Sequence, residues 1–163
     1  MNLPKPVKFE VERYVEGLSK FKKIENPIKL SANESALGAS PKAIQAIEKN
    51  KDKIFKYPES DCNSLREGLS KKFNIDHKRI ICGSGSDQIF DLTCRLFLEP
   101  GDEVVVTEFG FIMHRIYASL YKAKVILAKE KNFKASVDEI LGKVTDKTKI
   151  VFIANPNNPT GTY

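Results

Sequence analysis

The chain has 163 residues, 41% of them hydrophobic and 29% charged, which is typical of a folding soluble domain and not of a disordered or fibrous chain. Its net charge of +6 comes from scattered basic residues, so we expect neither a nucleic-acid partner nor a membrane partner. No apolar run approaches the roughly 18 residues of a membrane span, and the start lacks the apolar core of a secretory signal. We therefore expect a cytoplasmic protein, and the spacing of its three cysteines predicts no metal site.

The first forty residues have singly spread apolar residues and several prolines, which indicates an arm that packs on another part of the protein. Two helices are expected after the arm. Ser40 and Pro41 supply an N-cap and a first-turn proline for a helix over Pro41–Lys49. A stripe of apolar residues predicts a second helix that begins near Asp61.

From Arg79 onward, short β-rich runs alternate with helical patterns, as in a parallel sheet with crossover helices. The expected strands are Arg79–Cys82, Glu103–Thr107, Lys124–Ala128 and Lys149–Ala154. The last of these is a continuous apolar run, for which we expect a central place in the sheet, buried on both faces.

Helical patterns fill the gaps between these strands. Apolar residues at spacings of three and four predict helices over Ser86–Leu98 and Phe111–Tyr121. A short third helix follows Phe133 and opens with a capping box between Ser136 and Glu139. The fold class is therefore α/β.

A glycine-rich turn, Gly83-Ser84-Gly85-Ser86-Asp87-Gln88, stands between the first expected strand and the first crossover helix. Backbone N–H groups at such a turn and helix start can receive a phosphate dianion. The dinucleotide fingerprint fails because Gln88 occupies its third glycine position. A tight turn capped by Ser86 or Asp87 explains the same residues without a ligand.

Two more segments follow expected strands. The loop after the last strand, Asn155-Pro156-Asn157-Asn158-Pro159-Thr160-Gly161, can direct side-chain amides into a site at the strand ends, although a plain turn explains its prolines equally well. Phe109 follows the second strand, where an aromatic ring either stacks on a planar ligand or belongs to the core.

The order of these segments resembles the first half of the fold type I pyridoxal-phosphate aminotransferases, most closely their histidinol-phosphate branch. The matching segments are Leu30–Glu34, Tyr57-Pro58-Glu59, the glycine-rich turn, Phe109-Gly110-Phe111 and Asn155–Gly161. The resemblance implies a partial large domain, a mostly parallel sheet with crossover helices, preceded by an N-terminal arm. Residues 1–55 are then the arm and a contribution to the small domain, and residues 56–163 are the first half of the large domain, which binds the cofactor.

The resemblance also implies site residues for the cofactor pyridoxal 5'-phosphate. Gly85, Ser86 and Asp87 match family residues that hold its phosphate. Phe109 matches the aromatic residue that stacks on its pyridine ring, and Asn158 matches the asparagine that hydrogen-bonds its ring oxygen.

Three further matches concern the substrate and a second subunit. Tyr57 matches a tyrosine that reaches the cofactor phosphate of the neighbouring subunit, which implies a homodimer for the full-length protein. Tyr14 and Asn33 match positions near the substrate. The sequence departs from the family at Gln88, where an acidic residue is common, and at Phe109, where tyrosine or histidine is commoner.

The implied activity is transfer of an amino group between L-histidinol phosphate and 2-oxoglutarate in histidine biosynthesis. Another enzyme of the branch, such as an aromatic aminotransferase or a threonine-phosphate decarboxylase, shares the same motifs, and a non-catalytic truncated product is a third possibility. The Schiff-base lysine of the family falls beyond residue 163. We therefore expect no catalytic residue in this fragment and no activity from it alone.

Overall fold

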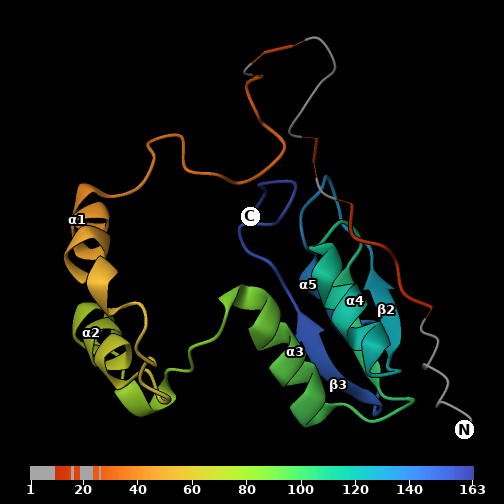
Figure 1. Cartoon of the computed structure of the whole chain (residues 1–163). Helices are drawn as coiled ribbons and strands as arrows, with labels where there is room; N and C mark the ends of the chain where they lie inside the picture. The colour runs from red at the N-terminus through yellow and green to blue at the C-terminus, as the bar shows by residue number, and fades with distance from the viewer. Residues whose placement is uncertain (1–9, 16, 19–23, 26) are drawn as a thin grey trace, which may run out of the picture. The chain divides into compact units, whose positions relative to one another are not determined.

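The computed structural model describes residues 10–15, 17–18, 24–25 and 27–163, and the chain divides into two compact units. The first unit joins the described residues up to Tyr14 with Gly83–Tyr163 and contains the sheet. The second unit spans Val15–Cys82 and contains the first two helices (Figure 1). The division of roles between residues 1–55 and 56–163 stays a prediction.

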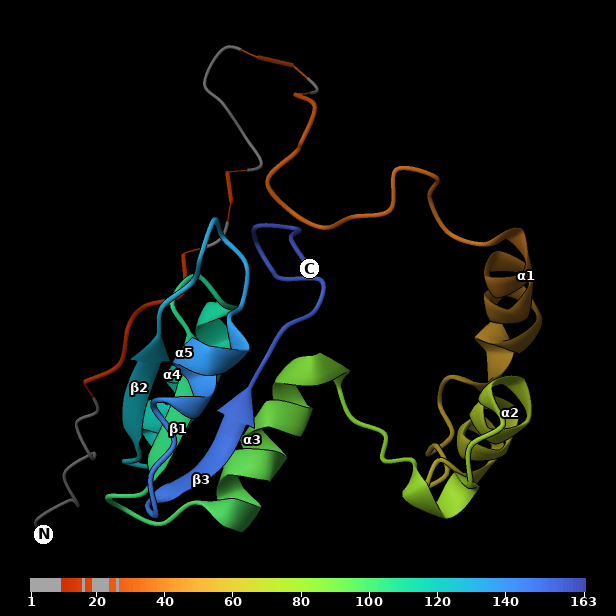
Figure 2. The same ribbon diagram turned by 180° about the vertical axis from the view of Figure 1, so that it is seen from behind.

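The sheet has three parallel strands in the order β2-β1-β3, with bounds Glu103–Thr107 for β1, Lys124–Ala128 for β2 and Thr148–Phe152 for β3. Three of the expected strands are thus confirmed. The expected central place of the last strand is wrong: β1 is central and all five of its residues are buried. The reason is the crossover through α5, which carries the chain past β1 and leaves β3 at an edge with alternating exposure (Figure 2).

Helices cover both faces of the sheet. α3 (Gly85–Phe97) and α4 (Ile112–Leu120) pack on one face, and α5 (Val137–Leu141) packs on the other. Because side chains alternate along a strand, neighbouring valines of β1 serve opposite cores. The core under α3 and α4 contains Cys94, Leu98, Val104, Val106, Ala118 and Ala123, whereas the core under α5 contains Val105, Ala128 and Ile140.

The helices α3, α4 and α5 begin within about one residue of the expected positions. The capping box expected at the start of α5 is wrong. Ser136 precedes the helix and makes no side-chain capping hydrogen bond. Glu139 instead approaches Lys131, whose Nζ lies 3.9 Å from its Oε1. The exposed ion pair replaces the reciprocal hydrogen bonds of the motif.

The second unit contains the two expected helices, α1 (Pro41–Asn50) and α2 (Asn63–Phe73), with a short 3-10 turn, Lys51–Lys53, after α1. The expected strand over Arg79–Cys82 is wrong, because the chain forms a 3-10 turn at His77–Arg79 and then continues without regular structure. A strand is stabilised by a hydrogen-bonded neighbour, and no strand in the described part of the chain pairs with this run. Among the described helices, none has the length and hydropathy to cross a membrane.

Candidate functional site

The loops after β1 and β3 and the start of α3 lie together at the carboxyl ends of the strands, which we call the carboxyl edge of the sheet. β1 and β3 are parallel, so the loops that follow them leave from the carboxyl edge. Phe90, in the first half of α3, packs its ring on Phe152, the last residue of β3, at 5.6 Å between ring centroids. The start of α3 therefore faces the same edge (Figure 2), which is where parallel sheets bind their ligands.

The glycine-rich turn leaves backbone donors free at the start of α3. Gly85 has a φ of +75°, a left-handed conformation that glycine adopts without strain. The N–H of Ser84 donates to Oε1 of Gln88 at 2.6 Å, so Gln88 closes the turn. In the described structure no carbonyl accepts from the N–H groups of Ser86 and Asp87. Ser86 is exposed and Asp87 is partly exposed, so these donors and the positive end of the helix are available to an anion.

The peptide of Phe109 is held from two sides at the end of β1. Its N–H donates to Oε1 of Glu130, which follows β2, at 3.1 Å. Its carbonyl accepts from Nδ2 of Asn157, which follows β3, at 3.3 Å. Phe109 is 43% exposed, and its ring centroid lies 5.3 Å from that of Phe133. A planar ligand can reach this ring, although its backbone is fixed.

The loop after β3 is organised around Asn157. This residue is buried, its N–H donates to the carbonyl of Thr162 at 2.8 Å, and its carbonyl accepts from Gly161 at 2.8 Å. The next residue, Asn158, is partly exposed and makes no side-chain hydrogen bond in the described structure. Asn158 thus presents a free amide at the carboxyl edge, while Asn157 holds the loop.

Two residues near the candidate site, Glu130 and His114, were not predicted from the sequence. Glu130 contacts Phe109 from a position 21 residues away, and no motif marks it. His114 is 4% exposed, stacks on Phe152 with 4.7 Å between centroids and meets Phe90 edge-on at 4.6 Å. Burial among these rings lowers the pKa of His114 to about 4, so the ring is neutral and serves as an apolar packing group. The only sequence feature that could have predicted its burial is its position among the apolar residues of α4.

The remaining candidate residues stay predictions. Tyr14 belongs to the unit with the sheet and is about half exposed. Asn33 and Tyr57 belong to the second unit, where both are exposed.

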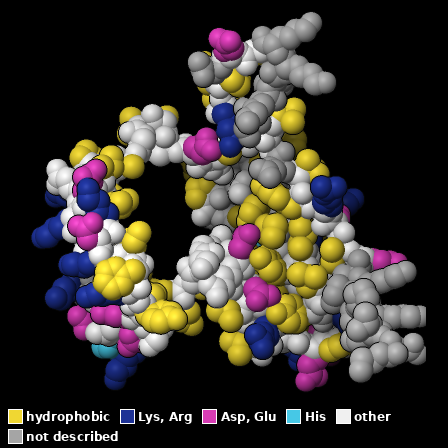
Figure 3. All heavy atoms as spheres, viewed as in Figure 1, with side chains coloured by type: hydrophobic (Ala, Val, Ile, Leu, Met, Phe, Trp, Pro, Cys, Tyr) yellow, Lys and Arg dark blue, Asp and Glu magenta, His cyan; other side chains and the backbone are white. Residues whose placement is uncertain are grey.

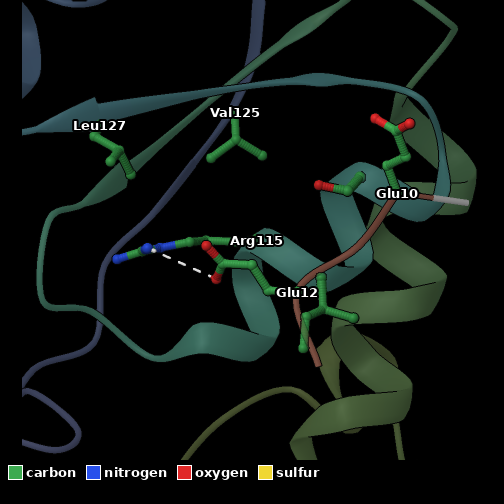
Figure 4. A pocket seen from close by; sticks show the side chains of 7 residues that line it. Glu10, Glu12, Arg115, Val125 and Leu127 are labelled. Carbon is green, nitrogen blue, oxygen red and sulfur yellow. Dashed lines mark ion pairs between the residues drawn. The ribbon is translucent and has the colours of Figure 1, made fainter. Parts of the chain in front are cut away.

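A cavity of about 250 Å³ lies elsewhere in the first unit, between the arm, α4 and β2 (Figure 4). Its walls are Glu10, Glu12, Arg115, Ile116, Ser119, Val125 and Leu127. Nη1 of Arg115 lies 3.9 Å from Glu12, and Nη2 donates to the carbonyl of Glu108. None of the residues expected to bind a cofactor lines this cavity, so it tells us how the arm packs and not where a cofactor binds.

Comparison with known proteins gives a consistent set of relatives. The family described as aminotransferase class I and II matches residues 25–163. Histidinol-phosphate aminotransferase of Pelagibacter ubique is 56% identical over all 163 residues, which is 45% of that protein. The corresponding protein of Rhodospirillum rubrum is 45% identical over 159 residues, 98% of this chain and 43% of that protein. The chain thus spans less than half the length of these curated relatives.

Solved structures confirm the expected fold, a partial fold type I large domain. A Sinorhizobium meliloti histidinol-phosphate aminotransferase in complex with pyridoxal-5'-phosphate matches with a TM-score of 0.78 and 24% identity, over 81% of this chain and 36% of that chain. An aspartate aminotransferase from Thermotoga maritima matches with a TM-score of 0.66 and 27% identity, over 83% of this chain and 39% of that chain.

Proposed function

Because this chain belongs to the class I and II aminotransferase family, we propose that it acts as part of a pyridoxal-phosphate-dependent histidinol-phosphate aminotransferase. Such an enzyme transfers an amino group between L-histidinol phosphate and 2-oxoglutarate in histidine biosynthesis. The observation that carries the choice of substrate is the 56% identity to the Pelagibacter ubique protein over the whole chain. Further curated relatives at 42–45% identity carry the same name, so an aromatic amino donor is the weaker candidate.

The free donors at the carboxyl edge fit the cofactor's phosphate and ring. When bound, pyridoxal phosphate supplies the electron sink for removal of a proton from the amino donor. The N–H groups of Ser86 and Asp87, with Gly85 in its left-handed conformation, are proposed to bind its phosphate dianion. The exposed face of Phe109 fixes the plane of its ring, and the free amide of Asn158 binds its ring oxygen.

In the whole protein, Tyr57 is proposed to reach the cofactor phosphate of a second subunit, which makes the enzyme a homodimer. The exposure of Tyr57, 101%, is consistent with a contact outside its own unit. Tyr14 and Asn33 are proposed to bind the substrate. Together with the expected location, these assignments give a cytoplasmic enzyme with small-molecule substrates.

A chimera tests the proposed reaction. Residues 1–163 are joined to the part of the Pelagibacter ubique relative that they do not match, and glutamate formed from 2-oxoglutarate is measured with L-histidinol phosphate, tyrosine and aspartate as amino donors. We expect L-histidinol phosphate to be preferred by at least tenfold in kcat/KM. A folded chimera that prefers tyrosine or aspartate, beside a native relative that prefers L-histidinol phosphate, would contradict the proposed substrate.

The phosphate site is tested by the Ser86→Ala variant of the same chimera. The hydroxyl of Ser86 is proposed to join the two N–H groups in binding the phosphate. Its removal should raise the pyridoxal phosphate concentration for half-maximal activity by at least about tenfold, because a hydrogen bond to a charged group contributes about 1.5–3 kcal/mol. Ser84→Ala makes the same chemical change two residues earlier, where the side chain forms no capping hydrogen bond, and should have no effect. Equal effects of the two variants would argue against the assignment of Ser86.

A further inference from the structure

We propose that Asn157 is a positioning residue that fixes the Phe109 peptide, and thereby the orientation of the Phe109 ring, through its side-chain amide. The benefit to a bound cofactor rests on the function proposed above, whereas the effect on Phe109 does not. No motif assigned this role to Asn157, whose neighbour Asn158 was the candidate for ligand binding.

The amide of Asn157 joins two loops that are far apart in the sequence. Its Nδ2 donates to the carbonyl of Phe109, 48 residues away, at 3.3 Å, and to Oγ1 of Thr160, within its own loop, at 2.9 Å. The two donor hydrogens therefore have separate acceptors, one in each loop. The loop that carries Asn158 and the peptide that carries Phe109 are held together by this one side chain.

The backbone of Phe109 makes a second hydrogen bond, to Glu130, which makes the bond from Asn157 effective in fixing the backbone. Glu130 accepts from the N–H of Phe109, so the peptide has a partner on the β2 side and another on the β3 side. With both bonds in place, the backbone of Phe109 has little freedom, and its ring packs at 5.3 Å from Phe133. Without the Asn157 bond, the Phe109 carbonyl loses its partner on the β3 side, and the backbone on either side of the ring is held only by Glu130 and by the N–H of Gly110, which donates to the carbonyl of Thr107 at 3.1 Å.

Stability alone does not account for an asparagine at this position. Its side-chain Oδ1 is buried and has no hydrogen-bond partner in the described structure. A buried acceptor without a partner costs about 1–3 kcal/mol. The residue therefore fixes geometry at some cost in folding free energy, as is common at functional sites.

The geometry matters because stacking depends on the ring's plane. A displacement of about 1 Å in a positioning group is enough to lower a reaction rate about 100-fold. Asn157 is thus inferred to act through Phe109 and not by touching the cofactor.

The experiment uses the 163-residue chain and three variants: Asn157→Ala, the isosteric Asn157→Asp, which cannot donate when ionised, and the matched control Asn155→Ala at an exposed position of the same loop. Without ligand, amide hydrogen exchange is followed by NMR at Phe109 and at Val105 in the core of β1. We expect at least tenfold faster exchange at Phe109 in both Asn157 variants, and a change below twofold at Val105. The control should leave both unchanged.

With pyridoxal phosphate added, the circular dichroism induced in its absorption band reports how its ring is held. We expect both Asn157 variants to lower this signal at least threefold. Exchange at Phe109 that is unchanged, or that rises only together with exchange at Val105, would overturn the positioning role and leave Asn157 structural. The same measurement is made on the chimera described above. Should neither the unsubstituted chain nor the unsubstituted chimera show an induced signal, the proposed cofactor fails, while the exchange at Phe109 still decides the role of Asn157.

Discussion

At the scale of single residues, His114 links the packing of the sheet to pH. Its pKa falls to about 4 from the ordinary histidine value of 6.5 because burial disfavours the charged ring. A group with a lowered cationic pKa binds its proton more weakly in the folded state than in the unfolded chain. The stability that neutral His114 provides is therefore complete above about pH 6.5 and is lost progressively as the pH falls toward 4.

The variant His114→Phe should remove this dependence. Between pH 7 and pH 5 we expect the native chain to lose about 2 kcal/mol of unfolding free energy through His114, at about 1.4 kcal/mol per pKa unit. A phenylalanine keeps the ring stacking on Phe152 and has no proton to gain. Urea unfolding at both pH values, followed by circular dichroism, measures the difference. His77→Phe is the control at a partly exposed histidine, and an equal pH dependence in His114→Phe and the native chain would refute the assignment.

At the scale of elements, the tight turn after β1 depends on Gly110. Its N–H donates to the carbonyl of Thr107 at 3.1 Å, and a Cβ at this position would lie 2.5 Å from Oγ1 of Thr107. Gly110→Ala should therefore cost about 1–3 kcal/mol, as other overpacked sites do. Gly68→Ala makes the same change inside α2, where the new Cβ meets nothing within 4 Å, and should stabilise that helix by up to about 1 kcal/mol. Thermal unfolding measures the stability of the two variants. An unchanged melting temperature in Gly110→Ala would contradict the prediction and show that the Thr107 side chain moves aside at little cost.

The elements that could be predicted are those encoded by local pattern. The period of apolar residues located α2, α3 and α4, start signals located α1 and α5, and β-rich runs located β1, β2 and β3. The misplaced features depend on distant partners: Arg79–Cys82 reads as a strand but has no described neighbour, and the apolar run of β3 lies at an edge because β1 takes the centre. Sequence pattern gives an element its type, whereas its place in the sheet depends on the rest of the chain.

The candidate site divides in the same way. Gly85, Phe109 and Asn158 belong to short motifs and could be proposed before the structure was known. Asn157 and Glu130 act through single hydrogen bonds that span 48 and 21 residues, and such pairings leave no local pattern. The residues proposed to touch a ligand were therefore easier to predict than those that hold them in place.

At the scale of the whole chain, burial is concentrated in the unit that contains the sheet. β1 is buried along its full length, whereas no described residue of the second unit is buried. α1 and α2 instead expose large apolar side chains, and Figure 3 shows hydrophobic side chains at the surface of this part of the chain. Helices of this length are marginal in water without tertiary packing. The two units should therefore differ strongly in local stability.

Amide hydrogen exchange on the 163-residue chain tests this difference. Amides of β1 open only with the core of their unit, so we expect them to exchange at least 100-fold more slowly than the interior amides of α1 and α2, which open locally. The central amides of α3 are the matched helical reference, since α3 has a similar length to α2 but packs on the sheet through the fully buried Cys94. Protection of α2 equal to that of α3 would mean that helix propensity alone holds α2 together. Protection that follows burial would mean that α1 and α2 depend for their stability on covering their exposed apolar residues, which is the condition a second subunit would meet.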